Sequence, residues 1–463
     1  MTRGELTRRA LLQRVLAASS GVALFTTTDP ARALPPPQPK PLPKPPPVVV
    51  KPKTPPAPPP IRMAWPWPVH APDPWSSSDV VAALLGVALF PPLYVRAIDG
   101  YVEPKLAMGA PKERKLGVRV DLQPYIRPSD VVASLAKART GGARLVLRDI
   151  PVPRVDGQHG VLFPFVGDID GLMRKLATPL AGIARIEPRR FDPTGVFDMT
   201  VEERAGSKLL RLKRRSVWGA PSPALTLPHR VRVFELEGPL DLGESLRAFE
   251  RGDTDVAWLG DGLFAARPGA RSIDLGPLAY LALRAGKDAP ELAHAGGVLG
   301  LVESIPKERL DHLGLMRRGH VAPTSAAAFA RSAPNVPPGI PLLVRASSPI
   351  VIAAAEILAR DIGATTQAID DGAFDRTLAE GEFSLALDVV RPIDDTENGA
   401  AIALATFDGA TIAPAATVGP HAVAAAGSAA LGWEIALLGA EAGDVWIPRP
   451  PFGGLDLEGG GEA

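Results

Sequence analysis

The sequence predicts a mixed α/β protein, because strand-like and helix-like segments alternate in its carboxyl-terminal half. Residues 340–345 are strand-like, Ser348 and Pro349 open a helix over 350–361, and Gly363 ends it before a strand at 365–369. A helix over 371–379 and a strand over 382–390 continue the alternation. This order favours parallel strand pairs joined by helices. No fixed-period repeat is present, which disfavours a solenoid or a propeller.

The same periodicities place the earlier elements. We expect helices over 75–90, 130–139 and 242–249, and strands over 116–122, 209–214, 229–237 and 255–259. Ser77 and Ser78 are the expected cap of the first helix, and Ser129 that of the second.

Composition narrows the class of protein. The chain has 463 residues, 22% charged and 46% hydrophobic, with a formal net charge of +1, which is typical of a soluble globular protein. It contains no Cys, which excludes disulfides, thiolate metal sites, a cysteine nucleophile and a lipid-modified cysteine anchor.

The amino terminus, residues 1–33, is typical of an export signal. Basic residues precede a short apolar run, Arg8 and Arg9 resemble a twin-arginine signal, and 31–33 form an A-x-A cleavage site. We therefore expect export to the periplasm or cell envelope. An ordinary amphipathic helix is the alternative, and the sequence leaves open both the export route and whether the signal is cleaved.

Residues 34–60 are predicted to be an extended tether, because 15 of these 27 residues are Pro. Four Lys give the tether a charge of +4, and residues 1–33 carry +3, which leaves −6 for the body, 61–463. A negative body disfavours nucleic acid as a partner. The cationic tether fits electrostatic contact with an anionic envelope, and a plain solvated linker is the alternative.

A series of motifs in the body resembles the family 5 solute-binding proteins, the periplasmic peptide, dipeptide and nickel receptors of ABC importers. The segments that carry the resemblance, in order, are Asp73-Pro74 with 76–78, the block 92–107, the helix 127–135, the turn 192–197, the strand end 212–219, the segment 249–257, and 353–363 followed by 381–387. Their shared order, rather than any one motif, identifies the chain as a divergent and shortened member.

The resemblance implies a type II periplasmic-binding-protein fold, with two main lobes of mixed sheets around a cleft. The implied boundaries are a first lobe over 61–275 with a small subdomain inserted at about 110–170, a second lobe over 276–410, and a return segment with a tail over 411–463. It also implies a monomer that captures a small or peptidic solute and presents it to an ABC permease. A degenerate member that acts as an envelope interaction or sensory module is the alternative.

Four aromatic residues are candidates for ligand binding. Trp258 ends a strand in a Gly-rich segment, although a tryptophan there could equally pack the core. Trp65 and Trp67 flank Pro66 near the first strand and could line a cleft or hold the end of the tether. Tyr94 lies in one of the family-like blocks.

Acidic residues after 387 are candidates for binding a ligand ammonium. Asp388, Asp394 and Asp395 lie where peptide-binding relatives carry an acidic group, but the Trp of those relatives is missing here, and solvated turn residues are the alternative. Arg214 and Arg215 could bind a carboxylate or form a charged strand face.

Catalytic and cofactor motifs are not found in the sequence. It has no nucleophile elbow, no H-E-x-x-H pair, no phosphate loop and no dinucleotide fingerprint, and its seven His are scattered. We therefore expect a binding protein with no cofactor, no metal and no enzymatic activity.

Overall fold

The computed structural model describes most of the chain from residue 59 onward. The described ranges are 59–97, 100–164, 167–188, 190–215, 231–258, 267–292, 295–306, 308–316, 336–392, 429–442, 445–446, 454–455, 457 and 461–462. The predicted signal, 1–33, lies outside them, as does the predicted tether apart from Pro59 and Pro60. All the elements given below belong to one unit, Ala57–Ala463.

The described helices are short to medium in length. They are α2 (Val80–Leu89), α3 (Pro128–Thr140), α4 (Ile169–Leu176), α5 (Leu242–Arg251), α6 (Ala295–Ser304), α7 (Pro349–Ile362) and α8 (Asp371–Glu380), with the 3-10 turns η1 (Pro179–Ala181) and η3 (Asp311–Leu313). Among the described residues, no helix is long and apolar enough to cross a bilayer.

Twenty-one strands accompany these helices in the described part of the chain. They are β1 (Ile61–Ala64), β2 (Tyr94–Arg96), β3 (Val102–Pro104), β4 (Lys112–Arg114), β5 (Gly117–Asp121), β6 (Arg154–Val155), β7 (Gly160–Phe163), β8 (Ala184–Glu187), β9 (Arg190–Pro193), β10 (Phe197–Arg204), β11 (Ser207–Arg214), β12 (Val233–Gly238), β13 (Val256–Trp258), β14 (Arg271–Ala285), β15 (Leu315–Met316), β16 (Pro341–Arg345), β17 (Thr365–Ile369), β18 (Leu385–Val390), β19 (Ala429–Glu441), β20 (Val445–Trp446) and β21 (Gly461–Glu462).

Eleven of the strands form one mixed sheet. Its order is β10-β11-β12-β1-β13-β19-β14-β18-β16-β17, and β15 pairs with β19. β1 is parallel to β12 and β13, and β16 is parallel to β17 and β18, whereas the other pairs are antiparallel. The predicted mixed α/β class with parallel pairs is therefore confirmed.

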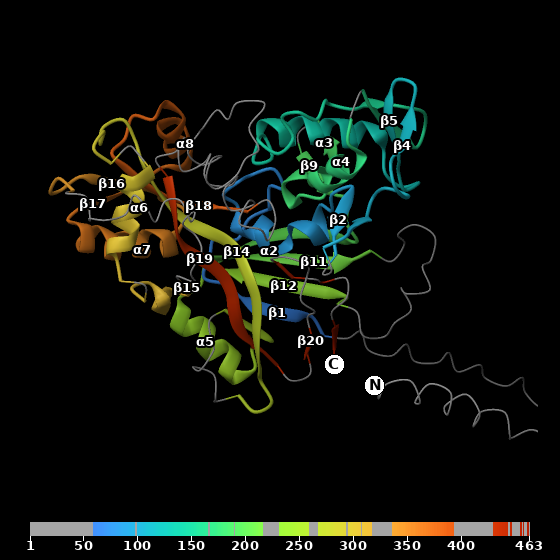
Figure 1. Cartoon of the computed structure of the whole chain (residues 1–463). Helices are drawn as coiled ribbons and strands as arrows, with labels where there is room; N and C mark the ends of the chain where they lie inside the picture. The colour runs from blue at the N-terminus through green and yellow to red at the C-terminus, as the bar shows by residue number, and fades with distance from the viewer. Residues whose placement is uncertain are drawn as a thin grey trace, which may run out of the picture. The chain divides into compact units, whose positions relative to one another are not determined.

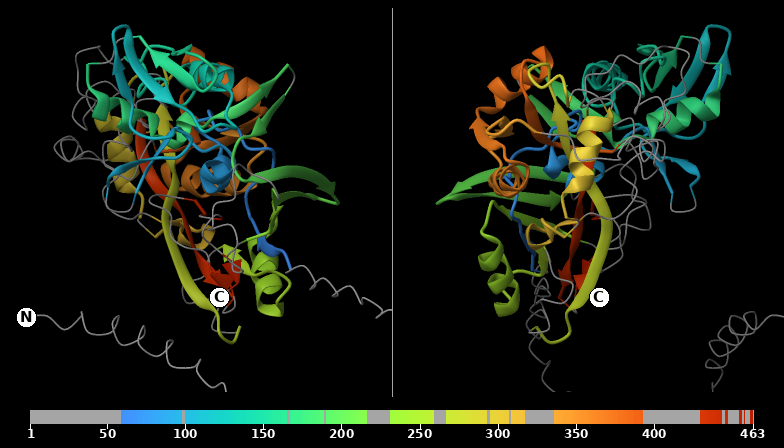
Figure 2. Two further views of the ribbon diagram at one scale, coloured as in Figure 1. Left: turned by 90° about the vertical axis from the view of Figure 1, so that its right-hand side faces the viewer. Right: turned by 60° about the vertical axis from the view of Figure 1, so that its left-hand side comes forward.

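Two long antiparallel strands occupy the middle of this sheet. β14 and β19 run side by side along their length in Figures 1 and 2, and their register extends from Arg271 opposite Glu441 to Arg284 opposite Ala429. β19 also pairs with β13, and β14 also pairs with β18. Every hydrogen-bonded path through the sheet from β1 to β16 therefore passes through these two strands.

The first two helices begin differently from the prediction. The cap of α2 is Asp79, whose Oδ1 accepts a hydrogen bond from the N–H of Ala82 at 2.8 Å, and not Ser77 or Ser78. The helix α3 begins at Pro128 with Arg127 as its cap, so Ser129 lies inside the first turn. Pro is favourable at this position because its fixed φ suits a helix and its missing N–H is not needed there.

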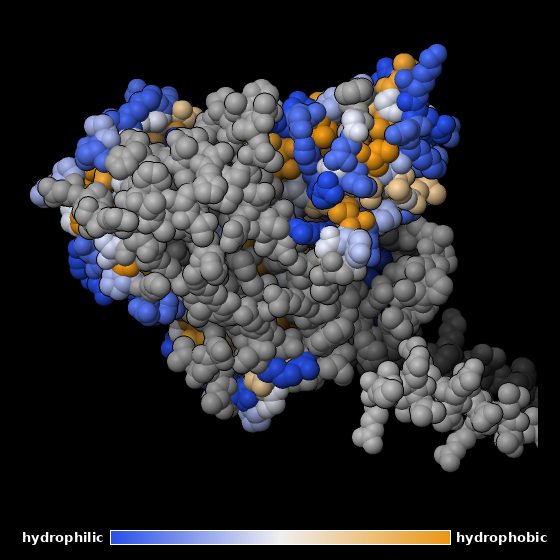
Figure 3. All heavy atoms as spheres, viewed as in Figure 1, coloured by the Kyte–Doolittle hydropathy of each residue, from blue (hydrophilic) through white to orange (hydrophobic). Residues whose placement is uncertain are grey.

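A small separate sheet lies within the interval expected to hold an inserted subdomain. Its order is β4-β5-β7-β6, and α3 packs against β6 and β7. Figure 3 shows charged side chains over β4 and β5, with apolar ones among them. Five of the seven exposed large hydrophobic residues among the described residues lie between 101 and 155, in and around this small sheet.

Arg391 joins the end of β18 to the first turn of α2. Its side chain is 3% exposed. Its guanidinium donates to the carbonyl oxygen of Ser76 at 2.9 Å and of Ala82 at 3.3 Å, and its backbone N–H donates to Ser77 at 2.7 Å. Burial lowers the pKa of Arg391 to about 10. The residue stays charged at neutral pH and is held by carbonyl dipoles.

We expect Arg391→Met to lower the free energy of unfolding by about 2–4 kcal/mol, because it removes the hydrogen bonds from a buried guanidinium to the carbonyl oxygens of Ser76 and Ala82. Urea unfolding followed by circular dichroism measures the change. The control is Arg251→Met, because Arg251 is 59% exposed and pairs with Asp253 at the surface. An equal loss in both variants would contradict the role assigned to Arg391.

Candidate functional site

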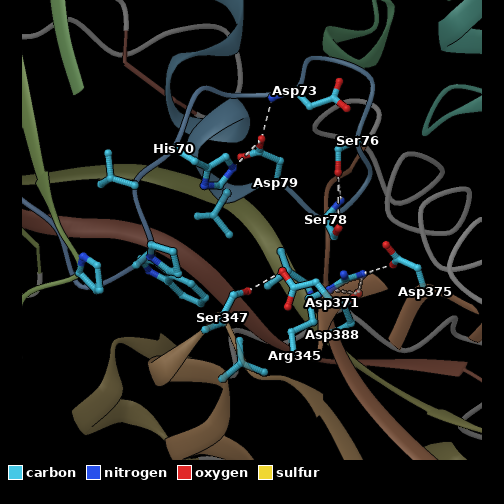
Figure 4. Close-up of a pocket in the computed structure, with 18 of the residues that line it drawn as sticks. His70, Asp73, Ser76, Ser78, Asp79, Arg345, Ser347, Asp371, Asp375 and Asp388 are labelled. Carbon is cyan, nitrogen blue, oxygen red and sulfur yellow. Dashed lines mark hydrogen bonds and ion pairs between the residues drawn. The ribbon is translucent and has the colours of Figure 1, made fainter. Parts of the chain in front are cut away.

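A cavity of about 620 Å³ lies between the segment that follows β1 and the segments that follow β16 and β17. Figure 4 shows the polar residues of the two sides and the hydrogen bonds and ion pairs within each side. The described residues that line it are Trp67, Pro68, Val69, His70, Asp73, Ser76, Ser78, Asp79, Val80, Lys208, Pro239, Arg345, Ser347, Ser348, Val351, Asp371, Asp375, Asp388 and Val389. A cavity of this size can hold a small organic solute.

The first wall is organised by Asp79. The Oδ2 atom of Asp79 lies 3.0 Å from Nε2 of His70 and accepts the backbone N–H of Asp73 at 2.7 Å. Its Oδ1 atom caps α2. One buried carboxylate therefore fixes both the start of a helix and the loop that lines the cavity.

His70 and Asp79 shift each other's titration. Burial alone lowers the pKa of His70, but the hydrogen bond and the negative charge of Asp79 outweigh it and raise the pKa above its usual value. Burial acts to raise the pKa of Asp79, and the hydrogen bond from His70 leads the interactions that lower it instead. Each partner thus favours the charged form of the other.

The second wall is organised by Arg345 at the end of β16. Its guanidinium contacts both carboxylate oxygens of Asp388, the shortest contact being 2.9 Å, and it reaches Asp375 at 2.7 Å. It also lies 4.6 Å from the ring centroid of Phe374. The hydroxyl of Ser347 donates to Asp371 at 2.7 Å, at the first residue of α8.

The Arg345–Asp388 pair is a buried ion pair, since Asp388 is 3% exposed. Burial lowers the pKa of Arg345, but the charges of Asp388 and Asp375 and their hydrogen bonds outweigh burial and raise it. Burial raises the pKa of Asp388, and Arg345 opposes that shift. The bidentate geometry keeps the Arg345 side chain in one orientation at the cavity wall.

The three predicted tryptophans lie together. Trp65 and Trp67 each meet Trp258 edge to face, with ring centroids 5.0 and 6.3 Å apart, and each of the three is at most 1% exposed. Trp67 lines the cavity, whereas Trp65 and Trp258 pack behind it in the core. None of the three indole N–H groups has a hydrogen-bond partner.

The other predicted residues lie in different places. Asp388 lines the cavity from within β18. Tyr94 is buried elsewhere and donates its hydroxyl hydrogen to the carbonyl of Gly109 at 3.1 Å. Asp394 and Asp395 lie outside the described residues. Arg214 donates to the carbonyls of Val231 and Leu457, and Arg215 donates to Asp198 at 2.6 Å. The role of all these candidates in ligand binding stays a prediction.

Sequence reasoning missed several residues of the cavity, chiefly His70, Asp79, Arg345 and Asp371. A signal for three of them was present. Arg345 ends a predicted strand, Asp371 follows the next, and the segment of His70 follows β1. The carboxyl ends of β16 and β17, which are parallel, lie at one edge, where ligands commonly bind in open α/β sheets. β1 runs in the opposite direction in the sheet, so the segment of His70 approaches the cavity from the other side. No group of three or more His, Asp or Glu residues suited to hold a metal occurs in the described part of the chain.

We expect the His70–Asp79 pair to stabilise the protein most in mildly acidic solution. Because folding raises the pKa of His70, its stabilisation is complete below the unfolded value of about 6.5 and is lost as the pH rises through the folded value. Because folding lowers the pKa of Asp79, its part is lost only as the pH falls well below about 4.

The loss of unfolding free energy in His70→Gln should therefore be larger at pH 5 than at pH 9 in urea titrations. His312→Gln, at an exposed position, is the control. A loss that is equal at both pH values, or larger at pH 9, would contradict the ion pair.

Known proteins resemble this chain in structure. No family model matches the sequence, and no curated protein matches it. The oligopeptide-binding protein AppA from Bacillus subtilis, solved with a nonapeptide, has a TM-score of 0.61 at 11% identity, covering 87% of this chain and 98% of its own. The dipeptide-binding protein from Pseudoalteromonas sp. SM9913, solved with Met-Leu, has a TM-score of 0.59 at 13% identity, covering 87% and 100%.

NikA from Brucella suis, solved with Fe(III)-EDTA, has a TM-score of 0.56 at 15% identity, covering 88% of this chain and all of its own. These three proteins bind different ligands, so the likeness concerns the scaffold. It extends over nearly all of the chain that follows the predicted tether. The chain has the fold of the type II periplasmic solute-binding proteins.

Proposed function

We propose that this protein is an exported member of solute-binding protein family 5 that captures peptide-like small solutes and delivers them to an ABC importer. The main support for the proposal is the cavity. Its walls come from the two parts of the main sheet that β14 and β19 connect, and its lining contains both polar and apolar groups. The order of the family-like motifs and the fold support the same reading. The signal-like amino terminus supports export to the periplasm or cell envelope.

The lining suits a solute with a peptide backbone. Trp67 supplies an aromatic side chain at the cavity wall. The cap residue of α7, Ser348, makes no side-chain hydrogen bond to the helix, so the first amides of α7 are open to a carbonyl or carboxylate oxygen near Val351. Val69, Val80 and Val351 add apolar surface for side chains.

Capture requires the two walls to approach each other. We propose that they move about β14 and β19, because these strands link the parts of the sheet that carry the walls. The closed form would then be the one that a permease recognises.

A filled cavity should abolish binding. We expect a screen of di- to pentapeptides on the wild-type protein to find ligands that raise the unfolding temperature, since a ligand at 100 times its Kd adds about 2.7 kcal/mol of stability. Ser347→Trp should remove that rise, because Ser347 lies at the cavity and the indole would occupy it.

The matched control is Gln367→Trp, an exposed position on the edge strand β17 that does not line the cavity. In this variant a bound ligand should still raise the unfolding temperature. If no peptide, amino acid or sugar shifts the wild-type protein, the proposal fails and the envelope interaction module becomes the better reading.

Closure of the two walls on a ligand should change the distance between spin labels placed on opposite walls. Because the chain has no Cys, spin labels can be placed at two introduced cysteines, Val201→Cys on β10 and Arg376→Cys on α8, both exposed. We expect a saturating peptide to change the interspin distance and to narrow its distribution. A pair within one wall, Arg376→Cys with Gln367→Cys, should not change. An unchanged Val201–Arg376 distance in the liganded protein would contradict closure.

A further inference from the structure

The part of the chain that holds the small sheet β4-β5-β7-β6 is strongly cationic. Residues 101–163 contain eleven Lys and Arg against six Asp and Glu, which gives this part a formal charge of +5. The rest of the body, residues 61–100 and 164–463, carries −11. This separation of charge turns the small sheet, and not the rest of the body, toward an anionic surface.

Several of these cations lie on one face of the small sheet. Its register places Lys112 opposite Arg119, Arg119 opposite Leu162, and Leu162 opposite Arg154. Residues opposite each other in neighbouring strands share a face, so Lys112, Arg119 and Arg154 form a row across the four strands. Arg114 follows Lys112 by two residues in β4 and shares its face.

The other face of the small sheet is packed. Val118 and Val120 of β5 lie opposite Phe163 and Val161 of β7, and each of the four is at most 3% exposed. These residues alternate along their strands with those of the basic row. The basic row therefore faces away from the packed side of the sheet.

The turn between β4 and β5 adds an apolar side chain to this charge. Residues 112–116 are all exposed, and Leu116 at the turn is 65% exposed. Figures 1 and 2 show the hairpin of β4 and β5 projecting from the elements around it. With Glu113 included, the segment 112–116 carries +2.

Two cations of the turn are not neutralised by the protein. Lys112 and Arg119 both pair with Asp121 at 2.7 Å, and Arg119 also pairs with Asp156. Arg114 and Lys115 form no ion pair with any residue that the structure describes. They are the charges that the hairpin offers to a partner.

The shape of the hairpin favours a lipid bilayer over a protein as that partner. A stable protein interface covers about 800 Å² on each side and has an apolar core. The projecting turn offers one large apolar side chain, Leu116, between a basic residue and Gly117. A bilayer needs no such area, because it attracts Lys and Arg by its surface charge and accepts an apolar side chain among its headgroups.

We propose that the hairpin of β4 and β5 docks on an anionic lipid bilayer, with Arg114 and Lys115 at the headgroup phosphates and Leu116 inserted between headgroups. The acidic rest of the body is repelled from the same surface, so the contact orients the protein on the membrane. This proposal goes beyond solute capture, because it involves no residue of the cavity.

Co-sedimentation of the full chain with lipid vesicles tests the proposal. One set of vesicles contains phosphatidylcholine alone, and the other contains equal parts of phosphatidylcholine and phosphatidylglycerol. We expect binding to the anionic vesicles, much weaker binding to the neutral ones, and a decrease in the first as the salt concentration rises.

Substitutions separate the hairpin from the amino terminus, because residues 1–60 carry +7 and can also bind anionic vesicles. Arg114→Gln combined with Lys115→Gln should weaken binding to the anionic vesicles about tenfold or more, since each basic residue near such a surface contributes about fivefold. The control is Arg360→Gln combined with Arg376→Gln, which removes two exposed cations from the acidic part of the body and should leave binding unchanged.

A label at the turn reports insertion directly. The chain has no Cys, so an environment-sensitive fluorophore can be attached to Leu116→Cys, and to Val201→Cys on β10 as the exposed control. We expect anionic vesicles to shift the emission of the label at 116 to shorter wavelength and to leave the label at 201 unchanged.

Three outcomes would overturn the proposal. They are the absence of wild-type binding to anionic vesicles in low salt, equal binding by the wild type and the Arg114→Gln, Lys115→Gln variant, and an unchanged emission of the label at 116. If the double variant binds vesicles normally but lowers solute uptake by cells, the hairpin contacts a protein instead. None of these outcomes bears on whether the cavity binds a solute.

Discussion

The structure depends on the pairing of β14 with β19. These two strands connect the region around β1 to the region around β16 within a single sheet, and no other described strand pairing does so. Their register shifts on both sides of Pro277, which faces Ala436. Pro has no N–H to donate to the ladder, and irregular pairing increases the local twist of a strand. A continuous sheet that is irregular at its centre can hold two walls together and still let them move relative to each other.

The cavity follows from how the parallel strands are arranged around that pair. β1 is parallel to β12 and β13, and the chain leaves its carboxyl end to form the loop of His70 and Asp79. β16, β17 and β18 are parallel to one another in the same way, and Arg345, Asp371 and Asp388 lie at or beyond the carboxyl-terminal parts of these strands. Within each group, strand direction brings side chains from distant parts of the sequence to the same end of the strands. β1 and β16 run in opposite directions in the sheet, and the segments that follow them bound the cavity from its two sides.

Local patterns predicted the elements well and the contacts poorly. Gly363, with φ of 72°, ends α7 where the sequence placed it, because glycine adopts the left-handed conformation at no steric cost. The helices predicted over 242–249 and 371–379 correspond to α5 and α8, whose caps Asp241 and Asp370 were not predicted. The pairing of Arg345 with Asp388 was not predictable in this way, since it joins β16 to β18 through a register that only the assembled sheet defines. Asp388 lay within the predicted strand 382–390 and was a candidate for binding a ligand ammonium, whereas its carboxylate is buried against Arg345.

The same ion pair restricts Arg345 at the second wall. A guanidinium that makes bidentate contact with a buried carboxylate has lost most of its freedom to turn toward a third acid, and Arg345 already serves both Asp388 and Asp375. Removing Arg345 from Asp388 to neutralise Asp371 would leave a buried carboxylate unpaired, which costs several kcal/mol, on the order of 3–5. Arg345 is therefore held on Asp388 and Asp375, and Asp371 keeps its hydrogen bond from Ser347 in the first turn of α8.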